Sequence, residues 1–289
     1  MDFISVLLNG LLTGCVFAQI ALPLSIMYGV LKLINFAHGE MIVGGMLVLC
    51  FLNNNLGLSP FIALPLTTVI FIFLLIFLNK VLYCKIQASK PTTQFINMIA
   101  LSIIFLNILL LFFKGDTYSY TLFKGSHLIN FLGMDIAYKK LIAAIISVVS
   151  TLFLYLFLNK TLIGKSIRAV AIAPYITKTL GLNTPKIFTY ALIIISILLS
   201  VSCFSLLLTM DVSIQNAPEF TLMCFIIVIL GGLGSISGTI ISSFIIGINE
   251  SFMTYYGSSL YKSTVTFLIF IVILLLKPQG LLGEKYKTS

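Results

Sequence analysis

Long apolar runs alternate with short polar breaks along this chain. A membrane-spanning helix needs about 20 predominantly apolar residues, and most of the runs approach that length. The pattern therefore predicts an all-α fold, a polytopic transmembrane helical bundle of about eight to nine spans. Three runs are too short for a full span, which predicts broken or re-entrant helices among them. The candidate spans are residues 3–31, 39–52, 60–79, 92–113, 139–159, 187–209, 220–233, 238–254 and 263–276.

Composition agrees with lipid as the solvent of this protein. Of the 289 residues, 60% are hydrophobic and 9% are charged, whereas a soluble domain carries about 25% charged residues. The net charge is +9, but the basic residues cluster between apolar runs. They do not form the basic face with interleaved aromatics that a nucleic-acid surface needs. We therefore expect the lipid bilayer as a partner and no nucleic acid.

The basic clusters also predict an orientation, because cytoplasmic loops of membrane proteins are enriched in Lys and Arg. Placing residues 80–91, 160–186 and the C-terminal tail in the cytoplasm, with Lys32, puts twelve of the 17 basic residues there. Only two of the eight acids, Glu40 and Glu284, are counted on that side. This predicts a cytoplasmic C-terminus and, with nine spans, an N-terminus on the outer side. No linker or low-complexity tract divides the chain, so residues 1–289 are interpreted as one membrane domain.

Residues 28–40, YGVLKLINFAHGE, form a polar island between apolar runs. Ionisable groups at hydrocarbon depth are costly unless they face protein or water, so they indicate a functional site. Asn35 and His38 would share a face if the stretch were helical. Together with Glu40, they could satisfy backbone groups exposed by a helix break hinged at Gly39. Alternatively, these groups line a transport path directly, or form a proton relay.

A second candidate is the glycine-rich stretch GGLGSISG, residues 231–238. Glycine-rich loops can cradle phosphate, but no GxxxxGK[ST] pattern occurs in the chain. Close helix packing or a re-entrant turn explains the glycines better. The residues of this stretch that we regard as candidates for the path or for a helix break are Gly231, Gly232, Gly234, Ser235 and Gly238.

The loop 160–186 is predicted to hold a short amphipathic helix at the inner membrane surface. Glycines near each end provide start and stop signals, and a face of three alanines is shaped to dock into a groove on another protein. The alternative is a basic connector held by anionic lipid headgroups. The candidate coupling residues are Gly164, Arg168, Ala169 and Gly181.

Two further polar features lie within apolar runs. Glu250, near the end of the eighth run, is expected either in a water-filled vestibule on the outer side or at the outer water interface. Pro23 lies inside the first run, where it should free backbone carbonyls that need partners.

No catalytic set is recognisable. His38 and His127 lie far apart in the sequence, the five cysteines form no CxxC, and there is no GxSxG, HExxH or pair of acids placed for chemistry. We therefore expect no catalytic residues, no metal site and no enzyme activity in this chain.

Residues 28–45, YGVLKLINFAHGEMIVGG, resemble the first signature of LivH-type permeases of branched-chain amino acid ABC transporters. Three other stretches are similar to later signatures of that family. Residues 164–183 resemble its cytoplasmic loop that couples to the ATPase, residues 231–238 its late glycine-rich segment, and residues 277–283, KPQGLLG, its C-terminal signature. The stretch 173–178, APYITK, departs from the family pattern because it lacks the usual Ala-Ala pair.

The resemblance implies a permease subunit in the bacterial inner membrane that moves branched-chain amino acids. Its expected partners are a second related permease subunit, two cytoplasmic ATPase subunits and a soluble substrate-binding protein. ATP and Mg would be bound by the ATPases, with no cofactor in this chain, and the loop 160–186 would transmit their motion. A stand-alone ion-coupled secondary transporter or channel for small polar or zwitterionic solutes is the alternative. A membrane enzyme or assembly factor acting on lipid is a third hypothesis.

Overall fold

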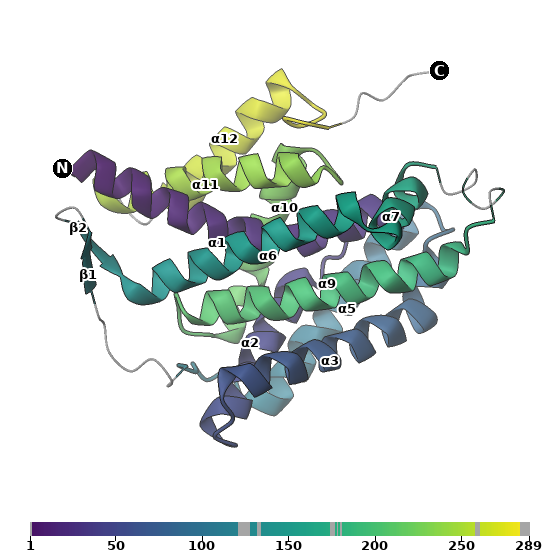
Figure 1. The fold of residues 1–289 in the computed structure, drawn as a ribbon, viewed down its shortest axis with the longest axis horizontal. Helices are drawn as coiled ribbons and strands as arrows, with labels where there is room; N and C mark the ends of the chain where they lie inside the picture. The colour runs from purple at the N-terminus through teal and green to yellow at the C-terminus, as the bar shows by residue number, and fades with distance from the viewer. Residues whose placement is uncertain are drawn as a thin grey trace.

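The computed structural model is a bundle of helices with one small β-hairpin (Figure 1). It describes residues 2–120, 128–131, 134–173, 177, 179, 181–257 and 261–283. The first part of the chain forms α1 (Asp2–Leu31), α2 (His38–Asn54), α3 (Pro60–Leu78), a π-helical turn (Asn79–Tyr83), α4 (Cys84–Ile86) and α5 (Pro91–Phe113). The rest forms β1 (Leu128–Phe131), β2 (Met134–Ala137), α6 (Tyr138–Lys160), α7 (Leu162–Ile172), α9 (Thr184–Leu207), a 3-10 turn (Ile214–Asn216), α10 (Ala217–Gly231), α11 (Ile236–Tyr256) and α12 (Lys262–Leu276).

Seven helical segments among the described residues are long and apolar enough to cross a membrane. This confirms the prediction of a helical, polytopic bundle. The helices α2 and α12, with 17 and 15 residues, are shorter, so the count of eight to nine spans stays a prediction. The seven segments are Phe3–Leu31, Pro60–Ile86, Pro91–Phe113, Tyr138–Lys160, Thr184–Leu207, Ile214–Gly231 and Ile236–Tyr256.

Local sequence signals explain where many helices begin. Proline stands in the first turn of α3, α5, α9 and α10, where its missing N–H costs nothing and its fixed φ favours the helix. Side-chain caps begin α7 and α11, and also α9, which has both signals. Thr161 caps α7, Asn183 caps α9 and Ser235 caps α11, each accepting a hydrogen bond from a backbone N–H of the first turn.

The chain breaks between α1 and α2 and turns back along α1. Lys32 has a φ of 56°, in the left-handed region, and the helix does not resume until His38. There the Nε2 atom of His38 lies 2.9 Å from the carbonyl oxygen of Ile20, in the middle of α1. The helix α2 therefore begins halfway along α1. Asn35 lies in the non-helical segment, so the expectation that it shares a helical face with His38 is wrong.

A second break separates α9 from α10. The chain leaves α9 at Leu207 and passes through a 3-10 turn before α10 begins at Ala217. The first turn of α10 lies against the first turn of α2, where the amide of Gly39 donates to the hydroxyl of Thr221 at 2.9 Å. The thiol of Cys224 also lies 3.5 Å from the Ile20 carbonyl. We call α2 and α10 the half-helices, because each begins beside the middle of α1.

The contacts that α1 makes with its neighbours are repeated by α9, which runs in the opposite direction. The helix α1 starts at the end of the bundle that carries the N-terminus, whereas α9 starts at the end that carries α7 (Figure 1). α1 packs against α11 and α10, and α9 correspondingly packs against α3 and α2. The segments α1–α3 and α9–α11 thus correspond as an inverted repeat, an arrangement typical of transporters.

Small residues let α1 and α11 approach closely. A Cβ atom at Gly10 would lie 2.7 Å from the Cα atom of Ile248, and one at Gly247 would lie 2.6 Å from the Cα atom of Gly14. Such contacts between small residues are how helices associate in lipid, where no hydrophobic force drives them together. The pair α1–α11 thus anchors one repeat to the other.

The β-hairpin was not predicted from the sequence. Strands β1 and β2 pair antiparallel, with Leu128 opposite Ala137, and lie at the end of the bundle that carries the N-terminus (Figure 1). A bridge between Tyr118 and Val212 ties the chain before the hairpin to the segment that precedes α10. His127 lies outside the described residues.

Candidate functional site

The two half-helices meet at Gly39. A Cβ atom there would overlap the carbonyl oxygen of Ala217 and the hydroxyl of Thr221, and would lie 2.8 Å from the amide nitrogen of Thr221. Only glycine therefore permits this approach. The φ of Gly39 is not in the left-handed region, and the residue lies inside α2. Gly39 thus serves a close helix contact, and the expectation that it is the hinge of the break is wrong.

His38 satisfies the backbone of α1. Its side chain is buried, and because a carbonyl oxygen can only accept, Nε2 carries the hydrogen that it donates to Ile20. Pro23 lies in the next turn and has no N–H for the carbonyl of Gln19. The hydroxyl of Ser202, on α9, lies 2.8 Å from that carbonyl. The prediction that the proline frees backbone groups that find partners is confirmed.

Asn35 shapes the turn into α2. Its Oδ1 atom accepts a hydrogen bond from the amide of Ala37 at 3.0 Å, a local bond that replaces a helical one. Its Nδ2 atom lies 3.4 Å from the sulfur of Met41. The buried amide is therefore used within its own segment.

Glu40 occupies the first turn of α2, where the positive end of the helix dipole stabilises a carboxylate. The residue is 4% exposed. Its Oε1 atom accepts a hydrogen bond of 2.6 Å from the hydroxyl of Ser102, on α5. Its Oε2 atom is buried and has no hydrogen-bond partner among the described residues. Glu40 is thus the residue of the polar island with a buried side-chain oxygen that lacks a hydrogen-bond partner among the described residues.

The glycine-rich stretch forms the tight turn between α10 and α11. A Cβ atom at Gly231 or Gly238 would overlap the backbone of the other residue, so both must be glycine. Gly232 and Gly234 have φ values of 101° and 82°, which favour glycine. The hydroxyl of Ser235 accepts from the amide of Gly238 and caps α11. The glycines thus allow α10 and α11 to pack closely at a tight turn, which is the first of the two roles predicted for this stretch.

The C-terminal segment lies on this turn. The amide of Leu281 donates to the carbonyl of Leu230 at 2.8 Å, and that of Leu282 donates to Gly231 at 3.0 Å. These bonds satisfy carbonyls that the end of α10 leaves free. The C-terminal segment therefore forms one structural unit with the glycine turn, although the two begin 46 residues apart in the sequence.

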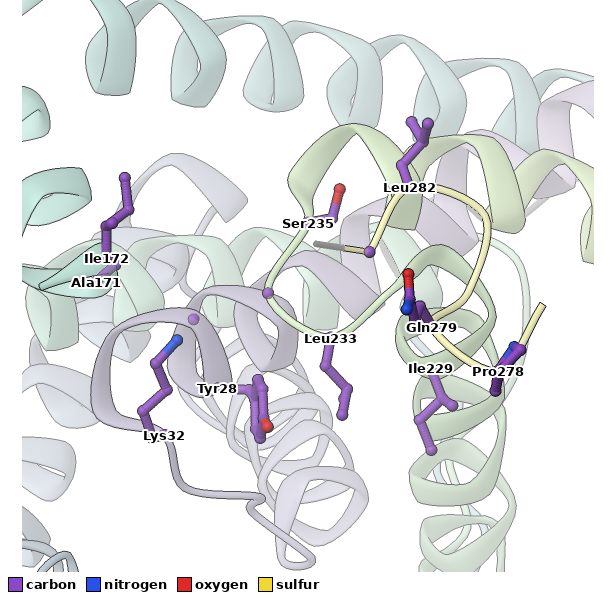
Figure 2. A pocket seen from close by; sticks show the side chains of 13 residues that line it. Tyr28, Lys32, Ala171, Ile172, Ile229, Leu233, Ser235, Pro278, Gln279 and Leu282 are labelled. Carbon is purple, nitrogen blue, oxygen red and sulfur yellow. The ribbon is translucent and has the colours of Figure 1, made fainter. Parts of the chain in front are cut away.

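A cavity of about 630 Å³ opens beside this unit. Four parts of the chain line it, namely the end of α1, the end of α7, the turn between α10 and α11, and the C-terminal segment. Figure 2 shows Lys32 and Ile172 on one side and Gln279 and Pro278 on the other. The lining residues are Tyr28, Gly29, Lys32, Ala171, Ile172, Ile229, Leu233, Gly234, Ser235, Pro278, Gln279, Leu282 and Gly283.

The helix α7 is amphipathic, as the sequence predicted for the loop 160–186. Gly164, Ile167 and Val170 are buried, whereas Lys165 and Arg168 are exposed. The boundaries differ from the prediction, because the cap is Thr161 and the helix ends at Ile172.

The glycines of this loop have roles other than the predicted ones. A Cβ atom at Gly164 would lie 2.5 Å from the Cα atom of Leu158, so this glycine allows α7 to pack on α6 and does not start the helix. Gly181 has a φ of 84° and forms a turn before α9. Ala169 is half-buried, as are Ala171 and Ala173, so the predicted face of small residues is not the exposed one. Residues 174–176, 178 and 180 lie outside the described part.

Glu250 lies apart from these groups. Its Oε1 atom forms an ion pair with Lys262, which joins α11 to the first turn of α12. This end of α11 is opposite to the glycine turn, near the N-terminal end of α1, where the hydroxyl of Ser251 donates to the carbonyl of Val6. Its place in a water-filled vestibule stays a prediction.

The structure thus brings the candidates together in three places. His38, Gly39 and Glu40 lie at the meeting of the half-helices, the glycines of residues 231–238 lie at the other end of α10, and Arg168 lies on α7. Sequence reasoning missed Ser102 and Thr221, because they are 62 and 182 residues from their partners. No local pattern could have indicated either of them.

The chain is similar to several known proteins. One solved structure that it resembles is PsaBC from Streptococcus pneumoniae in complex with Fab, with a TM-score of 0.49 and 15% sequence identity. The superposition covers 95% of this chain and 92% of the matched chain. It is 26% identical over 298 residues to the high-affinity branched-chain amino acid transport system permease protein BraD of Pseudomonas aeruginosa, covering 98% of this chain and 96% of BraD. It is 28% identical over 299 residues to the corresponding protein LivH of Escherichia coli, with the same shares covered.

The family model described as "Branched-chain amino acid transport system / permease component" matches residues 6–274. This match covers nearly all of α1 and α12 and the described helices between them, including both half-helices. The chain therefore belongs to the family of permease components of branched-chain amino acid transport systems.

Proposed function

We propose that this chain is the transmembrane permease subunit of an ATP-binding-cassette importer, and that it moves branched-chain amino acids across the bacterial inner membrane. The observation that carries the proposal is the meeting of two half-helices in the middle of the bundle. Discontinuous helices whose ends meet inside a bundle are how transporters build a path for a polar solute. Membership of the permease family and the names of the relatives support the substrate.

The partners that we propose are a second related permease subunit, two cytoplasmic ATPase subunits and a soluble substrate-binding protein. ATP and Mg belong to the ATPases in this proposal, and the permease itself is no enzyme. Transport then needs a surface on this chain that receives the motion of the ATPases. The exposed Lys165 and Arg168 on α7 provide it.

The contacts offer a route from α7 to the path. Ala171 and Ile172, at the end of α7, line the same cavity as Ile229, near the end of α10. The C-terminal segment is bonded to α10 at this place. At its other end, α10 holds the first turn of α2 through Thr221. A shift of α7 would therefore move α10 and change the meeting of the half-helices.

We propose an orientation with α7, the glycine turn and the C-terminus in the cytoplasm, the N-terminus and the β-hairpin outside, and nine spans including α2 and α12. The distribution of Lys and Arg supports it, since Lys80, Lys160 and Lys186 lie at the α7 ends of α3, α6 and α9. The half-helices α2 and α10 then run from the middle of the bundle toward opposite sides of the membrane.

Reconstitution of the purified complex tests the function. The four kinds of subunit are co-expressed and purified through a tag on this chain, and ATP-driven uptake of radiolabelled leucine into proteoliposomes is measured. We expect ATPases to co-purify and uptake to need both ATP and the binding protein. Uptake by this chain alone, driven by a proton or sodium gradient, would contradict the proposal. It would favour an ion-coupled secondary transporter, for which the buried Glu40 is the candidate site.

A further inference from the structure

Two glutamates within the helices, Glu40 in α2 and Glu250 in α11, differ in how their charge is balanced. Glu250 has Lys262 as its counter-ion. Glu40 forms no ion pair with any Lys, Arg or His of the described residues. Each keeps one buried oxygen without a hydrogen-bond partner there. The two residues therefore differ in the counter-ion, which Glu250 has and Glu40 lacks among the described residues.

Glu40 is incompletely stabilised by its own surroundings. The hydroxyl of Ser102 and the dipole of α2 act on it, but a buried acceptor left without a donor is costly, and more so when it is charged. The hydroxyl of Thr221 is nearby, but it has the carbonyl of Ala217 as an acceptor at 3.1 Å. The environment thus stabilises an anion but supplies no cation from the described residues to balance its charge.

We propose that the carboxylate of Glu40, where the two half-helices meet, binds the α-ammonium group of the amino acid in transit. This inference rests on the proposed function. An ammonium group supplies the positive charge and a donor for the free oxygen atom. The site lies between α5, which carries Ser102, and α10, which carries Thr221.

The neighbouring apolar residues fit the other end of such a substrate. Phe95 lies two helical turns from Ser102 on the same face of α5, and Phe225 lies one turn from Thr221 on α10. Phe36 joins them, with its ring centroid 4.9 Å from that of Phe95 and 4.7 Å from that of Phe225. This aromatic cluster, on the α7 side of Glu40, offers an apolar surface to an aliphatic side chain. Phe95 is 50% exposed, so the cluster is accessible from the surface.

Uptake by the reconstituted complex is the first test. We expect Glu40→Gln to reduce ATP-driven leucine uptake at least about tenfold, because a buried charge that loses its partner costs several kcal/mol. Glu40→Asp should retain part of the uptake. The matched control is Glu250→Gln, which removes a carboxylate that already has its cation and should leave uptake within about twofold. All three variants must assemble with the ATPases. Wild-type uptake by the Glu40→Gln complex would overturn the inference.

Labelling gives a second readout that a structural role would not change. Ser102→Cys is introduced with Cys15→Ser and Cys84→Ser, since the other three cysteines are buried. We expect a cationic methanethiosulfonate reagent to react about tenfold faster than an anionic one, by attraction to Glu40. Adding Glu40→Gln should abolish this preference, leucine should slow the cationic reagent, and the 2-oxo acid of leucine should not.

The outcomes separate this inference from the proposed function. If the wild-type complex moves no amino acid, the proposed function fails, whatever the labelling shows. If uptake is normal and the reagent preference is the same with and without Glu40→Gln, only the inference fails. Protection by sodium ions alone, in place of leucine, would also overturn it, because the occupant would then be an inorganic cation.

Discussion

Gly39 and Thr221 join the two half-helices in the middle of the bundle. The amide of Gly39 donates to the hydroxyl of Thr221 at 2.9 Å, and that hydroxyl in turn donates to the carbonyl of Ala217. One side chain thus ties the first turns of α2 and α10, which belong to opposite halves of the inverted repeat. Because the carboxylate of Glu40 follows directly in α2, any change at this contact changes the proposed path.

Replacing Gly39 with alanine should separate the half-helices. The new methyl group would overlap Ala217 and Thr221, and overpacking a core typically costs about 1–3 kcal/mol. We expect Gly39→Ala to lower the melting temperature of the detergent-solubilised complex and to abolish uptake. Gly44→Ala, in the same helix, is the control, because the nearest atom to its methyl group is the flexible end of Leu109 at 3.3 Å. Equal stability of the two variants would show that α10 is not held at Gly39.

His38 provides a test of whether this residue supports the fold or contacts the substrate. His38→Ala removes the donor to the Ile20 carbonyl and leaves a cavity, so we expect a loss of about 2–5 kcal/mol in the free energy of unfolding. His38→Gln keeps an N–H donor and should recover part of that loss. Unfolding in a denaturing detergent measures both. If His38→Ala is as stable as the wild type but transports nothing, His38 acts directly on the path.

Sequence reasoning anticipated the helices well, because apolar runs of membrane length are determined locally. It also identified the short runs 39–52 and 220–233, which correspond to the half-helices α2 and α10. The break itself was misplaced to Gly39, since a glycine that permits close packing and a glycine that permits a turn look the same in a sequence. The structure separates the two, because Lys32 has the positive φ and Gly39 has the close contact.

Other features could not be predicted because they depend on contacts distant in sequence. Ser102 and Thr221 are ordinary polar residues in apolar helices until the fold brings them to Glu40 and Gly39. The ion pair of Glu250 with Lys262 likewise follows from the packing of α12 on α11. The C-terminal segment was recognised as a family signature, but its bonds to the end of α10 are visible only in three dimensions.

The contact between the C-terminal segment and the glycine turn can be tested at Gly280. Its φ is 79°, and a methyl group there would lie 2.5 Å from the amide nitrogen of Gly232 and 2.6 Å from the carbonyl oxygen of Ile229. We expect Gly280→Ala to reduce ATP-driven uptake several-fold by detaching the segment from α10. Gly57→Ala is the matched control. Its φ of 65° carries the same backbone strain of about 1–2 kcal/mol, but nothing lies within 4 Å of the new methyl group. Similar uptake in the two variants would assign any loss to backbone strain alone.

Reversing the charge of Arg168 tests whether α7 receives the motion of the ATPases. The side chain is exposed and forms no ion pair with the described residues, so substitution should change the stability of this chain by no more than about 0.5 kcal/mol. We expect Arg168→Glu to lower ATP hydrolysis stimulated by the loaded binding protein several-fold, because like charges at an interface weaken it. Arg168→Lys keeps the charge and should retain most of the stimulation. If Arg168→Glu leaves both stimulation and uptake unchanged, α7 is a connector held by anionic lipid headgroups, and the ATPases must engage another surface. The cavity beside Ile172 is then the next candidate, since it already joins α7 to α10.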